Sequence, residues 1–450
     1  MENKTNIINM TEGKPLPLML RFSVPMLLSN ILMVFYTLAD SAIIGRILGV
    51  TAFAAVGATA APHFWIFSIV MSMGHGFGIV FAQRFGGKDL DGLRRAFVTA
   101  VYLVVLIGTA IGLAGVFLSR FLLELLNTPA ELMEGATIYL SFLLGGMLIT
   151  FSYSLLGSIL RALGDSKTPL KAMILSSIVN IALNIPLVLL FGIAGVAAGT
   201  LFAQLIACTY CFVVLQKTGV LKGCTMKWDS QSANDLLRIG LPMGARDAVI
   251  QGSGLIIQWF VNGYGVDFVA GVSIAKRMYS LLMVAGGAFE GANGVFIAQN
   301  FGAKKIQRVQ EGLRVMVKLM LVSSVIVMAF TIPLRHFILR LLLEGEPERL
   351  RAVLDIGARQ LLILTLGLPL VYLLFAYRST LEGIGKPIFS VYSGVMELVF
   401  RIASILIFMP FVAQWGVLLA DPIGWVGATG LLVIAYYSII KKMSRDKQFA

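Results

Sequence analysis

The chain of 450 residues is 58% hydrophobic and only 13% charged, and its mean hydropathy is +0.87. A soluble domain carries about 25% charged residues, so this composition excludes a protein that faces water on all sides. The formal net charge is +13, but the basic residues gather in alternate loops between apolar segments. This distribution is typical of a membrane protein and excludes a nucleic-acid-binding surface.

Apolar runs of about twenty residues or more recur along the chain, each long enough to cross a hydrocarbon core about 30 Å thick. We predict an all-α integral membrane protein with about twelve transmembrane helices. The first run is expected to be a span, since the residues before it lack the pattern of a signal peptide. The predicted spans are residues 16–43, 52–82, 95–118, 135–160, 169–190, 193–215, 237–262, 268–298, 312–333, 356–378, 388–410 and 416–440.

The loops predict the orientation in the membrane. An even number of spans places both termini on one side, and that side holds 25 of the 36 Lys and Arg residues. The other side holds 7, with residues near the end of a span counted with the adjacent loop. The remaining 4 lie inside predicted spans (Arg246, Lys276, Arg277 and Arg401). Because positive loops stay in the cytoplasm, we expect cytoplasmic termini and a location in the cell inner (plasma) membrane.

An internal repeat divides the chain. Gly78, Ala82, Gln83, Phe85, Gly86 and Lys88 recur at one constant offset as Gly294, Ala298, Gln299, Phe301, Gly302 and Lys304. We expect an N-terminal six-helix lobe over residues 1–216, a cytoplasmic linker over 217–234 and a C-terminal six-helix lobe over 235–450. An even number of spans in each half predicts a pseudo-twofold axis along the membrane normal, with a central cavity between the lobes.

Sequence signatures of enzymes and of nucleotide-driven pumps are missing. No G-x-x-x-x-G-K-[ST] phosphate loop occurs, so the energy is expected to come from an ion gradient or from the gradient of the substrate. Cys208 and Cys211 lie on one apolar helix without a second pair, which favours packing over a metal or redox site. We expect neither a cofactor nor a metal site, and no enzymatic activity.

One carboxylate stands alone in the first predicted span. Placing Asp40 in a membrane costs at least about 2.5–3.5 kcal/mol, which makes a functional role the default hypothesis. Helical spacing puts Tyr36 on the same face, and Asn184 and Thr200 at a similar depth, with Asn180 one turn deeper. One acid among neutral hydrogen-bonding groups indicates a site for a proton or a monovalent cation. The alternative is that Asp40 caps a helix kink and that Asn180, Asn184 and Thr200 simply join neighbouring helices.

The second half carries different polar groups. It has no counterpart of Asp40, and Gln258 and Asn262 form an i, i+4 polar pair instead. Glu397 and Arg401 have the favourable order for an i, i+4 ion pair, which we expect to face the substrate cavity. The alternative is a purely structural bridge between packed helices. Three further groups carry charges within the predicted spans. Glu290 lines either the cavity or a packing seam, and the pairs Arg246–Asp247 and Lys276–Arg277 are expected to reach an interface.

These residues together resemble a known family. The set is similar to the landmarks of bacterial MATE (multidrug and toxic compound extrusion) exporters of the MOP flippase superfamily, over roughly residues 10–445. The matching motifs are Tyr36-Thr37-Leu38-Ala39-Asp40-Ser41, Ala82-Gln83-x-Phe85-Gly86-Gly87, Arg161-Ala162-Leu163-Gly164-Asp165, Asn180-Ile181-x-Leu183-Asn184, Gly240-Leu241-Pro242, Gln258-x3-Asn262 and Gln299-Asn300-x-Gly302.

The resemblance implies an exporter of amphipathic or cationic small molecules that exchanges them for H⁺ or Na⁺, as a monomer in contact with membrane lipid. It also implies that Tyr36, Asp40, Asn180, Asn184 and Thr200 form the cation site. Many family members carry a second aspartate at the position of Asn184, so its absence favours H⁺. Two alternatives remain: a flippase of lipid-linked precursors from the same superfamily, and a membrane-embedded enzyme.

The orientation can be tested by labelling. In a variant without native cysteines, single cysteines at residues 344–352 should react with a membrane-impermeant maleimide added to intact cells. Cysteines at 163–168 or 304–308 should react only after permeabilisation. The opposite pattern would contradict cytoplasmic termini.

Overall fold

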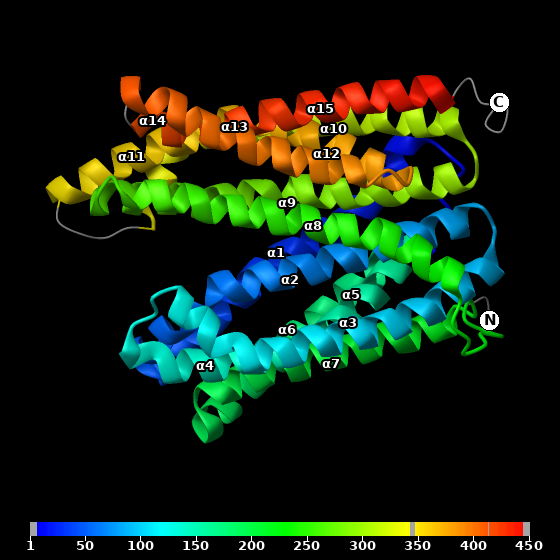
Figure 1. Cartoon of the computed structure of the whole chain (residues 1–450), viewed down its shortest axis with the longest axis horizontal. Coiled ribbons are helices and arrows are strands. Elements are labelled where there is room, and N and C mark those ends of the chain that lie inside the picture. The colour runs from blue at the N-terminus through cyan, green and yellow to red at the C-terminus, as the bar shows by residue number, and fades with distance from the viewer. Residues whose placement is uncertain (1–6, 343–346, 413, 444–450) are drawn as a thin grey trace. The chain divides into compact units, whose positions relative to one another are not determined.

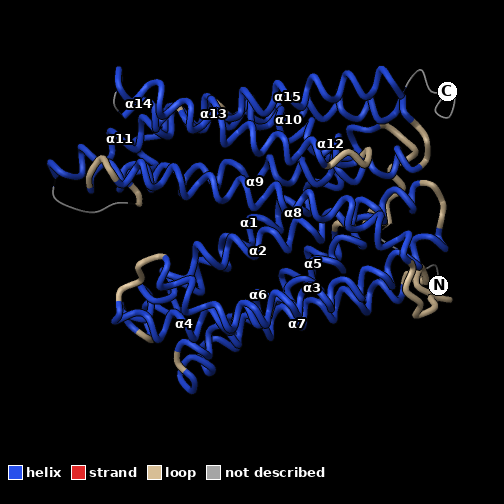
Figure 2. The backbone as a smooth tube through the Cα atoms, viewed as in Figure 1, coloured by secondary structure: helices blue, strands red, loops and turns tan. Residues whose placement is uncertain are grey.

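Helices make up every regular element of residues 7–342, 347–412 and 414–443, which the computed structural model describes (Figure 1). Short loops join them (Figure 2). The helices are α1 (Pro15–Ile47), α2 (Gly49–Gly86), α3 (Leu90–Leu125), α4 (Ala130–Gly145), α5 (Met147–Ala162), α6 (Lys167–Phe191), α7 (Ile193–Lys217), α8 (Ser230–Asn262), α9 (Val266–Gly302), α10 (Ile306–Arg340), α11 (Pro347–Leu366), α12 (Leu368–Gly383), α13 (Ile388–Val412), α14 (Gln414–Leu418) and α15 (Ala420–Met443).

The helices account for all the predicted spans. Among the described residues, nine helices are long and apolar enough to cross a membrane, and two bent pairs raise the number to eleven. These pairs are α4 with α5, bent by 43°, and α11 with α12, bent by 44°. The remaining predicted span, 237–262, corresponds to α8, whose charged and amide side chains lower its hydropathy. The prediction of an all-α membrane protein with about twelve spans is confirmed.

The chain forms two compact units. The first contains the described part of Met1–Gly13 together with Leu20–Gly244, and the second contains Lys14–Met19 together with the described part of Ala245–Ala450. In the first unit α6 packs against α7, and α2 packs against α4 and α5. In the second unit α9 packs against α10, α11 and α12, and α13 packs against α15. The lobe boundaries expected from the sequence stay a prediction.

The helix lengths follow the internal repeat. α1 and α8 each have 33 residues, α5 and α12 each have 16, and α6 and α13 each have 25. α2 and α9 end at Gly86 and Gly302, as the repeat predicts, and are followed by Lys88 and Lys304, both with φ of 59°. α12 begins at Leu368, slightly later than the offset from Met147 of α5 predicts, so extra residues enter the second half between α10 and α12.

The predicted linker lies against the first unit. Arg94 of α3 donates to the carbonyl oxygen of Val220 at 2.9 Å. Directly after the predicted linker, Asp235 of α8 pairs with Arg84 at the end of α2, at 2.7 Å. Asp229 accepts hydrogen bonds from the hydroxyl and the backbone amide of Ser232, which hold the pKa of this carboxyl below its usual value and cap the start of α8. These bonds fix the point at which the second half of the chain begins.

One basic residue was assigned to the wrong place. Arg378 was counted with a cytoplasmic loop, because the predicted span 356–378 ends at that residue. The helix instead continues to Gly383, and the Arg378 side chain is buried inside the second unit. The strong excess of basic residues on the side of the termini does not depend on this residue. Residues 344–346 of the labelling experiment lie outside the described residues.

Candidate functional site

The five residues expected to form the cation site come together in the first unit. Asp40 and Tyr36 lie on α1, Asn180 and Asn184 on α6, and Thr200 on α7. Both asparagines are fully buried, whereas Asp40 is partly buried. Residues up to 164 positions apart in the sequence thus meet in one cluster, as helical spacing predicted.

Hydrogen bonds connect the cluster. The Nδ2 atom of Asn184 donates to Oδ1 of Asp40 at 2.6 Å and to Oδ1 of Asn180 at 3.0 Å. The Tyr36 hydroxyl donates to Oγ1 of Thr200 at 3.4 Å and also lies within hydrogen-bonding range of Asp40. Nδ2 of Asn180 completes the cluster by donating to Thr200 at 3.5 Å. Every donor that the described residues bring to the Asp40 carboxylate is therefore neutral.

Glycines bring α6 and α7 close enough for these bonds. Gly192, with φ of 57°, makes the turn between the two helices, a backbone conformation that favours glycine. A Cβ atom at Gly199 would collide with the side chain of Asn184. The small residue therefore lets Thr200 and Asn184 approach across the helix interface, as is common in lipid.

The Asp40 carboxylate has no cationic partner among the described residues. Its further neighbour is Tyr139 of α4, which lies within electrostatic range of both Asp40 and Tyr36. The sequence did not identify Tyr139, since nothing in the apolar run 135–160 shows which face of that helix meets α1. An unpaired carboxylate in a membrane span can lower its energy by binding a proton or a cation.

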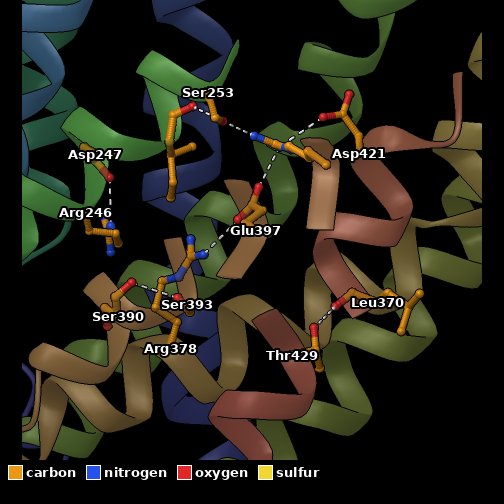
Figure 3. Close-up of polar contacts among 12 residues, drawn as sticks. Arg246, Asp247, Ser253, Leu370, Arg378, Ser390, Ser393, Glu397, Asp421 and Thr429 are labelled. Carbon is orange, nitrogen blue, oxygen red and sulfur yellow. Dashed lines mark hydrogen bonds and ion pairs between the residues drawn. The ribbon is translucent and has the colours of Figure 1, made fainter. Parts of the chain in front are cut away.

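The second unit contains the ion pair that the sequence predicted. Nη2 of Arg401 lies 2.6 Å from Oε1 of Glu397, one turn earlier on α13. The same guanidinium pairs with Asp421 of α15 at 3.0 Å and donates to the hydroxyl of Ser253 on α8. The other oxygen of Glu397 faces Nη2 of Arg378 on α12, at 3.5 Å (Figure 3). The predicted pair is thus part of a network across four helices.

A second pair of contacts was not expected. Arg246 is buried rather than extended to an interface, so that expectation was wrong. Its Nε atom lies 2.7 Å from Asp247 (Figure 3). Its Nη1 atom lies 2.5 Å from Glu382 of α12. The sequence predicts a loop after residue 378, but α12 continues to Gly383 and so includes Glu382. This acid provides Arg246 with a buried counter-charge.

Glu290 is near both groups of charges. It has no ion pair within 4 Å among the described residues, but it is in electrostatic range of Arg246 and Arg378. The expectation that Glu290 faces a functional interior therefore stays open. Gln258 and Asn262 do not join this network: they bond to each other at 2.9 Å at the end of α8, where Asn262 is exposed.

The described residues contain no group of three or more His, Cys, Asp or Glu side chains that could hold a metal ion. The cysteines Cys208, Cys211 and Cys224 are free thiols.

Comparisons with known proteins identify the family. The family profile described as MatE matches residues 25–186 and 242–407. The chain is 32% identical over 306 residues to Probable multidrug resistance protein YpnP of Bacillus subtilis, covering 66% of this chain and 68% of that protein. The chain belongs to the MatE family. It is therefore a membrane transporter.

Two other relatives match this MatE family member over nearly their full length. Probable multidrug resistance protein YoeA of Bacillus subtilis is 28% identical over 439 residues, which cover 94% of this chain and 93% of that protein. A FAD transporter of Shewanella oneidensis is 25% identical over 459 residues, which cover 98% of this chain and 97% of that protein.

Solved structures show the same fold. A MOP superfamily transporter from Pyrococcus furiosus superimposes with a TM-score of 0.90 at 22% identity, and the match covers 98% of this chain and 100% of that chain. The outward-facing conformation of a multidrug resistance MATE family transporter gives a TM-score of 0.88 at 22% identity, covering 99% and 100%.

The second-unit network can be tested by removing single charges. Glu397→Gln should lower stability by about 3–5 kcal/mol, because it leaves two buried guanidiniums without their shared carboxylate. Asp421→Asn should lower the stability by a smaller amount, since Arg401 keeps its ion pair with Glu397. The measurement is unfolding of the purified protein in detergent.

The double variant Glu397→Gln/Arg401→Ala is a further test. Two isolated charges would be removed together at little cost, but here Arg378 and Asp421 would each lose a partner. The double variant should therefore remain clearly less stable than the wild type. Wild-type stability of Glu397→Gln would show that the network does not form.

Proposed function

We propose that this MatE family transporter exports amphipathic and cationic small molecules by antiport, with protons as the coupling ion. The names of its relatives YpnP and YoeA, and of Multidrug export protein MepA of Staphylococcus aureus, support export of several drugs. The excess of basic loops supports a location in the cell inner (plasma) membrane with cytoplasmic termini. We expect a monomer, with its two six-helix lobes divided at residues 217–234.

The observation that carries the proposal is the unpaired Asp40 carboxylate. Its charge is stabilised by the short hydrogen bond from Asn184 and by the nearby Tyr36 hydroxyl. Among the described residues, no cationic side chain pairs with it. A carboxylate in such a position is costly to keep ionised, but it becomes neutral when it binds a proton. Asp40 would therefore carry the coupling proton.

Protonation would also change how α1 is held. Ionised Asp40 accepts a charge-assisted hydrogen bond from Asn184, and such bonds are about twice as strong as bonds between neutral groups. Protonated Asp40 loses this charge and becomes a donor, so the link between α1 and α6 weakens. The bound proton thereby shifts the equilibrium between conformations of the first lobe, which is the requirement for coupling to substrate.

The buried charges of the second unit suit a different role. Three arginines are buried in the described part of the second unit, Arg246, Arg378 and Arg401, and each lies near at least one carboxylate. These acids are held in ion pairs, so gaining a proton would break an existing contact. Together with Glu290, and with Gln258 and Asn262 at the end of α8, they would shape the lining that receives the substrate.

The first test is the variant Asp40→Asn, which keeps the shape of the side chain but cannot release a proton. In proteoliposomes with an imposed pH gradient, it should lose at least about 90% of the transport of a fluorescent cation. Asp91→Asn is the matched control, since Asp91 is exposed at the start of α3 and should tolerate the change. Full gradient-driven transport by Asp40→Asn would remove Asp40 from the mechanism.

The coupling ion is tested separately. Because Asn184 is neutral, the site has one carboxylate where a bound Na⁺ would favour two, so transport should follow a pH gradient in sodium-free buffer. Asn184→Asp restores a second carboxylate, and we expect it to make transport respond to sodium. Wild-type transport that depends on a sodium gradient at constant pH would contradict proton coupling.

A further inference from the structure

Arg161 and Glu382 occupy the same position in the two halves of the fold. Each is the second-last residue of its helix, and these helices, α5 and α12, are equal in length and correspond in the repeat. The carbonyl oxygen of Arg161 accepts from Gly164 at 2.8 Å, and that of Glu382 accepts from Gly385 at 2.9 Å. Both glycines have positive φ, of 90° and 74°. The same turn thus carries opposite charges in the two halves.

Among the described residues, the second half supplies a counter-charge for this position and the first half does not. Glu382 pairs with Arg246 of α8. The corresponding part of α1 is residues 29–31, whether the two helices are aligned at their prolines or at their ends, and none of these residues is charged. Arg161 has no carboxylate within 4 Å among the described residues, and its Nη2 atom donates to the hydroxyl of Ser158 at 3.0 Å.

The nearest acid in the sequence is committed elsewhere. Both oxygens of Asp165 accept bonds at the start of α6, from the amides of Lys167 and Thr168 and from the Thr168 hydroxyl. They satisfy backbone donors at the helix end. Asp165 is therefore the cap of α6 and leaves Arg161 without an anion.

The Arg161 side chain also points away from the groups that normally accept a terminal arginine. Its Nη1 atom lies over Gly157, one turn back along α5, and it interacts with Tyr153 and with Cys211 of α7. An arginine that stabilised the end of α5, or reached the cytoplasmic interface, would point the other way. The guanidinium is instead turned into the interior of the first unit, while the residue as a whole is only partly buried.

We propose that Arg161 binds an anionic group, a carboxylate or a phosphate, in the interior of the first unit. The ligand would be the counter-charge of Arg161, as Glu382 is the counter-charge of Arg246. The planar guanidinium can hold either group by two parallel hydrogen bonds. The group belongs either to a zwitterionic or acidic substrate of the proposed exporter or to an anionic lipid headgroup.

A matched pair of dyes distinguishes these sources. One is a rhodamine with a free carboxylate, and the other is its ethyl ester, which has the same ring system without the anion. Binding to the purified full-length protein is measured by fluorescence polarisation, for the wild type, Arg161→Gln and Arg161→Lys. Arg120→Gln is the control, since this arginine is exposed on α3. Bound phosphatidylglycerol is measured in parallel by native mass spectrometry.

If a substrate supplies the anion, Arg161→Gln should lower the affinity for the free-acid dye at least about tenfold, because a charge-assisted hydrogen bond is lost. The ester should bind as before, and Arg161→Lys should give an intermediate affinity. If a lipid supplies the anion, both dyes should bind Arg161→Gln with wild-type affinity, and this variant should carry less bound phosphatidylglycerol than the wild type.

Unchanged binding of both the acid dye and the lipid in Arg161→Gln would overturn the proposal. If Arg161→Gln does not fold, Arg161→Lys decides between the same outcomes, because it keeps the charge and loses the paired geometry. The assay measures binding without a gradient, so a wild type that binds the dye but transports nothing would contradict the proposed antiport and leave the Arg161 result valid.

Discussion

The structure depends on one constraint: in a bilayer, a polar group must find its partner within the protein. Backbone groups satisfy this by forming helices, which explains why every regular element of the described chain is helical. Charged side chains satisfy it across helix interfaces, and each unit contains such a cluster. In the first, Asn184 bonds to Asp40 between α6 and α1; in the second, Arg401 joins α13 to α15 and α8. Helix packing and polar chemistry are therefore set by the same contacts.

The two units meet this constraint in different ways, and the difference separates their roles. Asp40 is surrounded by neutral donors, so its charge can disappear when a proton binds without leaving an unpaired cation behind. Glu397 lies between two guanidiniums, so protonation there would leave both poorly compensated. A carboxylate that changes its charge at low cost suits energy coupling. A fixed network of opposite charges suits a stable, polar wall.

Much of this arrangement could be predicted from the sequence, because it follows from helical spacing and from the repeat. Tyr36 and Asp40 share a face of one helix, as do Glu397 and Arg401, and both relations are local. Contacts between distant helices could not be predicted in the same way. Arg378 and Glu382 were missed because the end of a helix is poorly marked when apolar and polar residues mix. Tyr139 was missed because its orientation depends on packing rather than on spacing.

The repeat also separates what the fold requires from what it permits. The turn after α5 and the turn after α12 keep the same backbone bonds and the same positive-φ glycine, so these features are required by the fold. Arg161 and Glu382 differ in charge at one position of that turn, so the fold accepts either sign there. A charge that the fold does not require, and that no described carboxylate neutralises, is costly in a membrane protein unless it serves function. The divergence of the two halves therefore points to Arg161 as a residue retained for a ligand.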